Sequence, residues 1–371
     1  MPVPDLAHIA VRLAACLPPE GAHRLAMRAL AAGLVPAPPV PADPRLRIDL
    51  FGRQFPNPVG IAAGFDKHGE AIAATLAQGA GFVEIGGVTP LPQAGNPKPR
   101  LFRLAQDRAV INRMGLNSEG FAAVAARLAR YRASGTERGR SDGNGIVGVN
   151  IGMNKDAADP AADYAAGVRA FAQHADFLTI NVSSPNTPGL RSLQGRAALR
   201  ALLERVGEAL GTVVTPRDPA LLVKVAPDLD EAGIADVAEV VLDVRDRAGR
   251  RLVSGLIVGN TTVSRPPELR SRHRGEAGGL SGRPLFAPST RVLGAVYRAT
   301  GGAVPLIGVG GIASGDDAYA KIRAGASLIQ LYSALVYAGP GLIRRIRRDL
   351  GMRLAADGHA TLADAVGADH R

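Results

Sequence analysis

Polar side chains stand at the ends of several apolar segments of this chain. Asn150, Asn181 and Asn260 each end or directly follow such a segment, and Lys224 lies inside another. Carboxamides and an ammonium suit a planar, neutral ring with several hydrogen-bonding atoms. An asparagine that only caps a helix or a turn would look the same, so one residue alone decides nothing. Their equivalent positions favour a ligand site.

Lysine is rare here, which makes its positions informative. Only five of the 44 basic residues are lysines, and the others are arginines. Where arginine supplies general positive charge, a lysine can mark a need for a compact ammonium, although codon bias could leave the same five. Lys67 follows the first apolar segment and suits an anionic group on a substrate. Lys321 is expected on an ordinary helix surface.

Two glycine- and hydroxyl-containing turns could bind phosphate. Residues 308–312 read Gly-Val-Gly-Gly-Ile before a helical pattern, and the last apolar segment ends in Gln330-Leu331-Tyr332-Ser333. Glycines let backbone N–H groups approach a phosphate closely at a helix N-terminus. Both turns together indicate a phosphorylated cofactor, for which FMN is the economical choice.

Residues 181–189 read Asn-Val-Ser-Ser-Pro-Asn-Thr-Pro-Gly and could form a catalytic loop or an ordinary polar turn. No Ser-His-Asp triad accompanies it. His68, His174 and His273 show no triad or metal-ligand spacing, so no metal site is expected.

The elements that must position these residues alternate regularly. Short apolar runs typical of buried parallel strands are each followed by a helical pattern, which predicts a (β/α)8 TIM barrel, with a doubly wound open sheet as the alternative. The runs are residues 58–63, 82–86, 146–152, 177–181, 221–226, 255–260, 304–310 and 327–332.

The segments outside this repeat suggest a domain organisation. We expect an N-terminal helical extension over residues 1–44, with helices at 3–16 and 19–34 and a proline-rich connector. The barrel is expected over 45–356 and a flexible tail over 357–371. A hairpin over 46–56 could close the barrel bottom, whereas long excursions at 90–113 and 261–282 would rise at the active-site end.

Composition excludes several classes of protein. The chain has 371 residues, of which 46% are hydrophobic and 21% charged, so it is not a disordered protein. Cys16 is the one cysteine, which excludes a disulfide scaffold and suggests a reducing compartment. No transmembrane segment or signal peptide is expected. The formal charge of +11 would suit nucleic acid, an anionic membrane or anionic small molecules.

Motifs over nearly the whole chain carry a family resemblance. They are residues 62–67 (AAGFDK), 95–103 (GNPKPRLFR), 111–117 (INRMGLN), 150–152 (NIG), 181–189 (NVSSPNTPG), 260–262 (NTT), 278–285 (GGLSGRPL) and 308–312 (GVGGI). In this set the chain resembles the dihydroorotate dehydrogenases. Ser184 stands where soluble class 1 members have a cysteine base, and the N-terminal helices resemble the extension of the quinone-dependent class 2.

The resemblance implies an activity and its residues. A class 2 member oxidises (S)-dihydroorotate to orotate through one FMN and reduces a membrane quinone, in de novo UMP synthesis. Ser184 would take the C5 proton, with Thr187 and a water as relays. Substrate would meet Lys67, Asn112, Arg113, Met114, Gly115, Leu116, Asn181, Asn186, Asn260 and Thr261. FMN would meet Ala63, Gly64, Phe65, Asp66, Lys67, Gly87, Asn150, Asn181, Lys224, Gly259, Gly282, Gly311, Tyr332 and Ser333. The quinone would meet His23 and Arg103.

The resemblance also implies a location. We expect a monomer held peripherally at an anionic surface on the cytoplasmic side of the cell membrane, with no nucleic acid partner. Two alternatives remain. One is an FMN-dependent dihydrouridine synthase acting on tRNA, which would need a cysteine acid that Cys16 is badly placed to supply. The other is a non-catalytic basic barrel, which the intact Lys67, Ser184, Asn186 and Lys224 oppose.

Two glycines depart from the family pattern. The family usually has a hydroxyl residue where Gly87 stands and a threonine where Gly259 stands. At both positions we therefore expect only backbone contacts with FMN.

Overall fold

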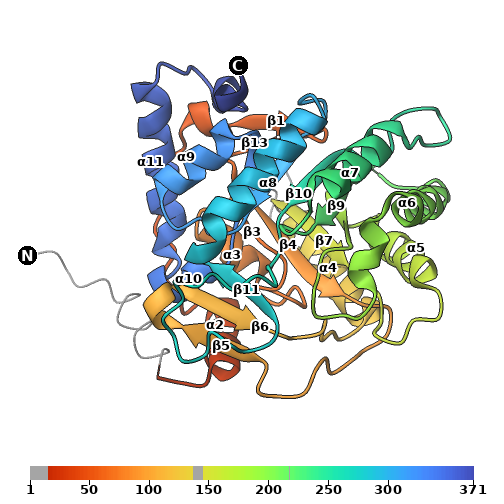
Figure 1. Ribbon diagram of the computed structural model, residues 1–371, viewed down its shortest axis with the longest axis horizontal. Helices are drawn as coiled ribbons and strands as arrows, with labels where there is room; N and C mark the ends of the chain where they lie inside the picture. Colours follow the sequence, from red (N-terminus) through yellow and green to blue (C-terminus); the bar gives the residue numbers. More distant parts are fainter. Residues whose placement is uncertain (1–15, 137–144, 217) are drawn as a thin grey trace, which may run out of the picture.

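The computed structural model describes residues 16–136, 145–216 and 218–371. Within these residues, eight parallel strands close into a barrel, which confirms the predicted (β/α)8 fold (Figure 1). In their order around the barrel they are β3 (Val59–Ile61), β4 (Phe82–Val88), β7 (Ile146–Ile151), β8 (Phe177–Asn181), β9 (Ala220–Val225), β10 (Gly255–Val258), β12 (Leu306–Val309) and β13 (Ala326–Leu331).

Helices follow the strands and cover the outside of the barrel (Figure 1). Several begin at an acidic or hydroxyl residue whose side chain accepts a backbone N–H, as Asp159, Asp230 and Ser314 do. Such caps each stabilise a helix start by about 1 kcal/mol. The helices are α3 (Ile72–Ala77), α4 (Phe121–Thr136), α5 (Pro160–Phe171), α6 (Arg196–Leu210), α7 (Glu231–Asp243), α8 (Phe286–Ala299), α9 (Gly315–Arg323), α10 (Ser333–Ala338) and α11 (Gly341–Ala356).

The predicted hairpin closes the barrel at the N-terminal ends of its strands. It consists of β1 (Ile48–Leu50) and β2 (Arg53–Phe55), paired antiparallel. The Phe55 ring packs edge-on against Phe82, with ring centroids 5.5 Å apart. Gly60 makes room for this packing, because a Cβ there would lie 2.2 Å from the Phe82 ring. The bottom of the barrel is therefore filled by aromatic side chains.

The two excursions pair with each other, which the sequence analysis did not anticipate. From the first come β5 (Leu101–Leu104) and β6 (Ala109–Asn112), and from the second comes β11 (Gly279–Gly282). They form an antiparallel sheet in the order β11-β6-β5, in which Asn112 stands opposite Gly279. This sheet has a small core of its own that includes Phe102, Ile111 and Leu280. It brings two distant parts of the sequence to one place.

The N-terminal extension is described in part. Helix α2 (Pro19–Ala31) lies beside β5 (Figure 1). Its Glu20 carboxylate pairs with Arg100 at 2.9 Å and with Lys98 at 3.4 Å, and this pairing fastens the helix to the first excursion. The helix expected over residues 3–16 lies outside the described residues, apart from Cys16.

The prediction of a flexible C-terminal tail over residues 357–371 is wrong. Residues beyond 357 form α12 (Leu362–Ala365) and a 3-10 turn (Ala368–His370) that pack on the barrel helices. Leu362 is buried, and the His370 ring stacks on Tyr297 at 5.2 Å. Asp364 completes a capping box with Thr361. Local capping and one buried leucine thus order a segment whose composition suggested a tail.

The expectation that Lys321 lies on a helix surface is also wrong. Its side chain is 0% exposed, and Nζ donates to Ser289 Oγ at 2.7 Å. The ammonium also lies 5.3 Å from the centre of the Phe286 ring. Gly308 on β12 borders the lysine stem, because a Cβ there would be in van der Waals contact with Lys321 Cδ at 3.4 Å. Burial lowers the pKa of Lys321 to about 7.

Lys321→Met should flatten the dependence of stability on pH. The ordinary lysine pKa is 10.5, so between about pH 7 and 10.5 the unfolded chain binds more protons than the folded one. The free energy of unfolding should therefore rise with pH in this window, by at most about 1.4 kcal/mol per unit from this group. The variant should lose that rise and gain stability near pH 7. Urea unfolding at several pH values measures it, with the exposed Lys155→Met as control. An unchanged slope would show that Lys321 does not titrate there.

Candidate active site

A chain of hydrogen bonds runs across the C-terminal ends of the barrel strands. Asn260 Nδ2 donates to Ser183 Oγ at 2.8 Å, and Ser183 Oγ donates to Asn181 Oδ1 at 3.0 Å. Asn181 Nδ2 donates to Asn150 Oδ1 at 2.9 Å, and Asn150 Nδ2 donates to Glu84 Oε1 at 2.7 Å. The three asparagines singled out in the sequence thus belong to one network that ends on a carboxylate.

Glu84 is the buried anion of this network, and the sequence analysis missed it. The side chain is 1% exposed. Besides Asn150, its carboxylate accepts from Gln330 Nε2 at 2.8 Å and lies 3.6 Å from Lys224 Nζ. A charge that deep requires matched donors. One signal was available, because a glutamate inside the otherwise apolar run 82–86 has no reason to be there unless it is paired.

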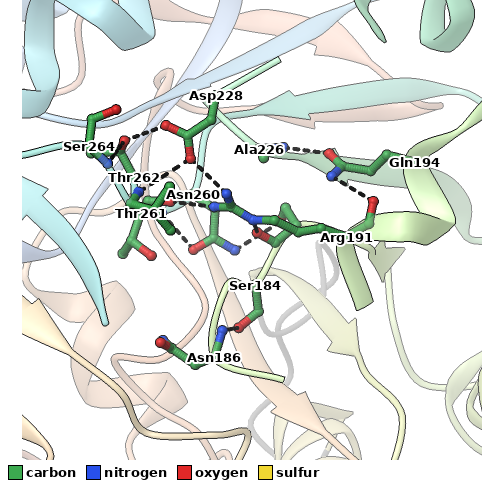
Figure 2. Close-up of polar contacts among 12 residues, drawn as sticks. Ser184, Asn186, Arg191, Gln194, Ala226, Asp228, Asn260, Thr261, Thr262 and Ser264 are labelled. Atoms are coloured by element: carbon green, nitrogen blue, oxygen red, sulfur yellow. Dashed lines mark hydrogen bonds and ion pairs between the residues drawn. The ribbon is translucent and has the colours of Figure 1, made fainter. Parts of the chain in front are cut away.

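The loop after β8 carries Ser184 to the mouth of the barrel (Figure 2). Ser184 is buried, and its Oγ accepts from the backbone N–H of Asn186 at 3.3 Å. Nearby, the hydroxyls of Thr187 and Thr261 are buried and have no hydrogen-bond partner among the described residues. Such groups need a partner, which a small polar ligand or water would supply.

The segment from Asn112 to Leu116 lies over this loop. Asn186 Nδ2 donates to Asn112 Oδ1 at 3.2 Å, and Asn96 Nδ2 donates to the carbonyls of Arg113 and Asn186. Leu116 reaches Gly87 at the end of β4, where a Cβ would be 2.9 Å from Leu116 Cδ2. The predicted substrate residues of both segments are therefore brought together.

Within that segment, backbone and side chain have different partners. The Met114 carbonyl accepts the backbone N–H of Asn96, and the Gly115 carbonyl accepts from Gln93 Nε2. The Arg113 guanidinium pairs with Glu276 at 2.8 Å and lies 4.6 Å from the Phe102 ring centre. Its charge is thus already matched by protein, and its backbone N–H donates to the Arg100 carbonyl at 2.9 Å.

The last two barrel loops each contact the segment that runs from β11 into α8. Ser333 Oγ donates to Ser281 Oγ at 2.8 Å, beside Gly282. Gly311 has φ +77°, and a Cβ there would lie 2.4 Å from the backbone nitrogen of Phe286. Only glycine fits such a close approach of two backbones. These are the two turns that the sequence predicts to bind phosphate.

Lys67 lies in the loop after β3, which is the neighbour of β13 in the barrel. Burial, together with the positive charge of Arg100, lowers its pKa to about 8, and Glu20 partly opposes this. The neighbouring Asp66 carboxylate accepts the backbone N–H groups of Glu70 and Ala71, at 2.9 and 2.8 Å, so it is engaged in holding the loop before α3. Ala63 N lies 3.4 Å from Glu84 Oε2, and Gly64 N donates to the Gly86 carbonyl at 2.6 Å.

The residues expected at a quinone lie on α2 and β5. The His23 ring is 5.8 Å from the Phe65 ring and 6.3 Å from the Tyr332 ring. Burial is the main cause that lowers the pKa of His23. Arg103 donates to the carbonyl of Leu17. His23 therefore stands next to two residues predicted to contact FMN.

Comparison with known proteins agrees with this geometry. The family model described as dihydroorotate dehydrogenase matches residues 45–354. The chain is 57% identical to dihydroorotate dehydrogenase (quinone) of Azorhizobium caulinodans, covering 95% of this chain and 96% of that protein. It is 56% identical to the Rhodospirillum rubrum enzyme of the same name, covering 96% and 92%. A ligand-free structure from Eimeria tenella superposes with a TM-score of 0.90 at 43% identity, covering 95% and 99%. The chain belongs to the dihydroorotate dehydrogenase family, in its quinone-dependent class 2.

Proposed function

We propose that this protein oxidises (S)-dihydroorotate to orotate and passes the electrons through FMN to a quinone, as a step of pyrimidine synthesis. The observation that carries the proposal is the convergence of Ser184, Lys67 and the Glu84-linked asparagines at one barrel mouth. Family membership supports the same activity. A tRNA-modifying flavoprotein or a non-catalytic barrel would leave this convergence unexplained.

The residues present fit FMN. Lys224 brings a buried ammonium to the barrel interior, suited to negative charge on a reduced flavin. Gly282, Gly311, Tyr332 and Ser333 would hold the phosphate, whereas Ala63, Gly64, Gly87, Asn150 and Asn181 would border the ring system. When bound, FMN supplies the acceptor for a hydride and the donor for a quinone.

The substrate would lie between Lys67 and the asparagines. Lys67 would pair with its carboxylate, and Asn112, Asn181, Asn186 and Asn260 would bind the polar edge of its ring, with the unpartnered Thr261 hydroxyl beside them. These groups would orient the ring so that C5 faces the loop of Ser184.

Ser184 would accept the C5 proton. A neutral hydroxyl is a weak base, so the proton must pass onward as it is taken. The Asn186 N–H, which donates to Ser184 Oγ, stabilises negative charge that develops on this oxygen. The buried Thr187 hydroxyl has a free hydrogen-bonding capacity within the described structure and would serve as a relay through water.

The quinone would approach from the side of α2. Leu25 and Leu34 are exposed on or just after this helix, and they would face the membrane. No helix of the described residues is long and apolar enough to cross a bilayer. We therefore propose peripheral attachment of a monomer to an anionic, cytoplasmic membrane face through residues 1–44, with His23 and Arg103 near the quinone.

A two-step flavin experiment tests this function. Dihydroorotate should bleach the flavin absorbance of the purified protein without oxygen, and a quinone should restore it. His23→Ala should slow the second step and leave the first unchanged. Bleaching by NADPH and not by dihydroorotate would contradict the proposal, and equal quinone rates in both proteins would remove His23 from the quinone site.

Ser184→Ala should keep its FMN and lose the first step. Removing a general base costs about 10²–10⁴ in rate, while no cofactor contact depends on this hydroxyl. Stopped-flow flavin reduction by dihydroorotate measures the loss, and quinone reoxidation serves as the internal control. A rate near wild type would exclude Ser184 as the base.

The value of kcat/KM for dihydroorotate should fall as the pH rises above about 8. There the free enzyme loses the Lys67 proton, and with it the charge that attracts the substrate carboxylate. Lys67→Arg keeps a positive charge at all these pH values, so its alkaline fall should move upward by a unit or more. The exposed Lys98→Arg is the control. Identical profiles in all three proteins would assign the fall to another group.

The two glycines that depart from the family should respond differently to substitution. Gly259 has φ +122°, and a Cβ there would lie 2.5 Å from the Val309 carbonyl oxygen, so Gly259→Thr should cost at least about 1–3 kcal/mol and release FMN. At Gly87 the nearest atom is the flexible end of Leu116, followed by Asn150 Oδ1 at 3.1 Å. Gly87→Ser should fold and change the FMN dissociation constant by about tenfold or less. Loss of FMN from Gly87→Ser, or unchanged stability of Gly259→Thr, would contradict this difference.

A further inference from the structure

One arginine joins the loops that follow β8, β9 and β10 (Figure 2). Arg191 lies in the 3-10 turn Leu190–Gln194, directly after the Ser184 loop. Its Nε donates to the Ser183 carbonyl at 3.0 Å and its Nη2 to the Thr261 carbonyl at 2.9 Å. Its Nη1 donates to Asp228 Oδ2 at 2.7 Å. The planar guanidinium can donate to these three acceptors, which lie in different directions. The single ammonium of a lysine could not reach all three at once.

Asp228 fixes the other end of this contact. The Thr262 hydroxyl donates to Asp228 Oδ1, and the Val263 N–H lies 3.4 Å from Asp228 Oδ2. The Ser264 N–H in turn donates to Thr262 Oγ1 at 3.0 Å. The loop after β10 is therefore tied to the guanidinium both directly, through the Thr261 carbonyl, and through this carboxylate.

Gln194 holds the turn that carries Arg191. Its Nε2 donates to the Arg191 carbonyl at 3.2 Å, and its Oε1 accepts the backbone N–H of Ala226 at 2.9 Å, just after β9. The backbone of Arg191 is thus anchored to the barrel. Its side chain therefore holds the neighbouring loops at a fixed place relative to the barrel strands.

The Arg191 charge is not available to a substrate anion. Asp228 neutralises it at 2.7 Å, and the two side chains are 24% and 21% exposed. Instead, the guanidinium fixes the positions of two backbone carbonyls to which it donates. One belongs to the peptide that precedes Ser184, and the other lies next to Asn260, which is proposed to bind the substrate ring.

We propose that Arg191 is a positioning residue for the proton transfer, which it serves by holding Ser184 at the correct distance from a substrate bound at Asn260 and Thr261. The inference rests on the proposed function. Reaction rates depend steeply on such placement, and a shift of about 1 Å can cost about 10²-fold. The quinone side, which lies at α2, does not depend on this contact.

Arg191→Lys in the FMN-loaded protein tests the proposal. Flavin reduction by dihydroorotate should slow by about 10–100-fold, with FMN content and quinone reoxidation unchanged. The isotope effect from deuterium at substrate C5 should grow, because proton removal becomes more limiting. Arg196→Lys is the matched control: this arginine lies nearby, is 53% exposed and pairs with Asp236 and Glu239 outside the site.

Asp228→Asn gives a second, milder probe that keeps the arginine. It should slow flavin reduction by less than Arg191→Lys, and the double variant should be no slower than Arg191→Lys alone. An unchanged rate of flavin reduction in both single variants would overturn the proposal. A parallel loss of FMN content, flavin reduction and reoxidation would also overturn it, because it would indicate general destabilisation. If dihydroorotate fails to reduce even the wild-type protein, the proposed function fails instead, so the two failures are distinguishable.

Discussion

The arrangement of the site depends on one buried carboxylate. Glu84 has almost no contact with solvent, so each of its oxygens must be matched by donors from the protein. Because a carboxylate only accepts, Asn150 must turn its NH2 group toward Glu84 and its oxygen toward Asn181. Asn181 then presents its own oxygen to Ser183. A single anion on β4 thereby fixes the orientation of amides as far as the sixth barrel strand.

The same carboxylate explains how an ammonium is retained in the barrel interior. Lys224 lies 3.6 Å from Glu84, which makes it half of a buried ion pair and not an isolated charge. Buried pairs of this kind add little to stability, because desolvation offsets their attraction. Their benefit here is a fixed positive charge at the place where the proposed cofactor needs one. On the proposed function, the pair serves the cofactor and not stability.

Sequence patterns predicted the barrel because its strands are continuous apolar runs that are each followed by a helical pattern. They also gathered the asparagines of the candidate site, since residues at equivalent strand ends share one mouth, whereas most of its other residues came from the family resemblance. They failed where position depends on a partner far away in the chain. Lys321 looked exposed because helical periodicity cannot show that Ser289 and Phe286 of the preceding helix surround its ammonium. Arg191 was one arginine among many until the loops around it were in place.

The antiparallel pairing of β6 with β11 has a consequence for the order in which the protein folds. It joins residues 109–112 to residues 279–282, with four of the eight barrel strands between them in the chain. Contacts so distant in sequence are entropically costly to close, so the local strand–helix units form first. On a ribosome the chain must be synthesised past β11 before Asn112 can meet its strand partner. The barrel itself closes only when β13 pairs with β3, which joins residues still farther apart in the chain. A chain released after β11 and before β13 therefore has neither a closed barrel nor a complete set of site loops.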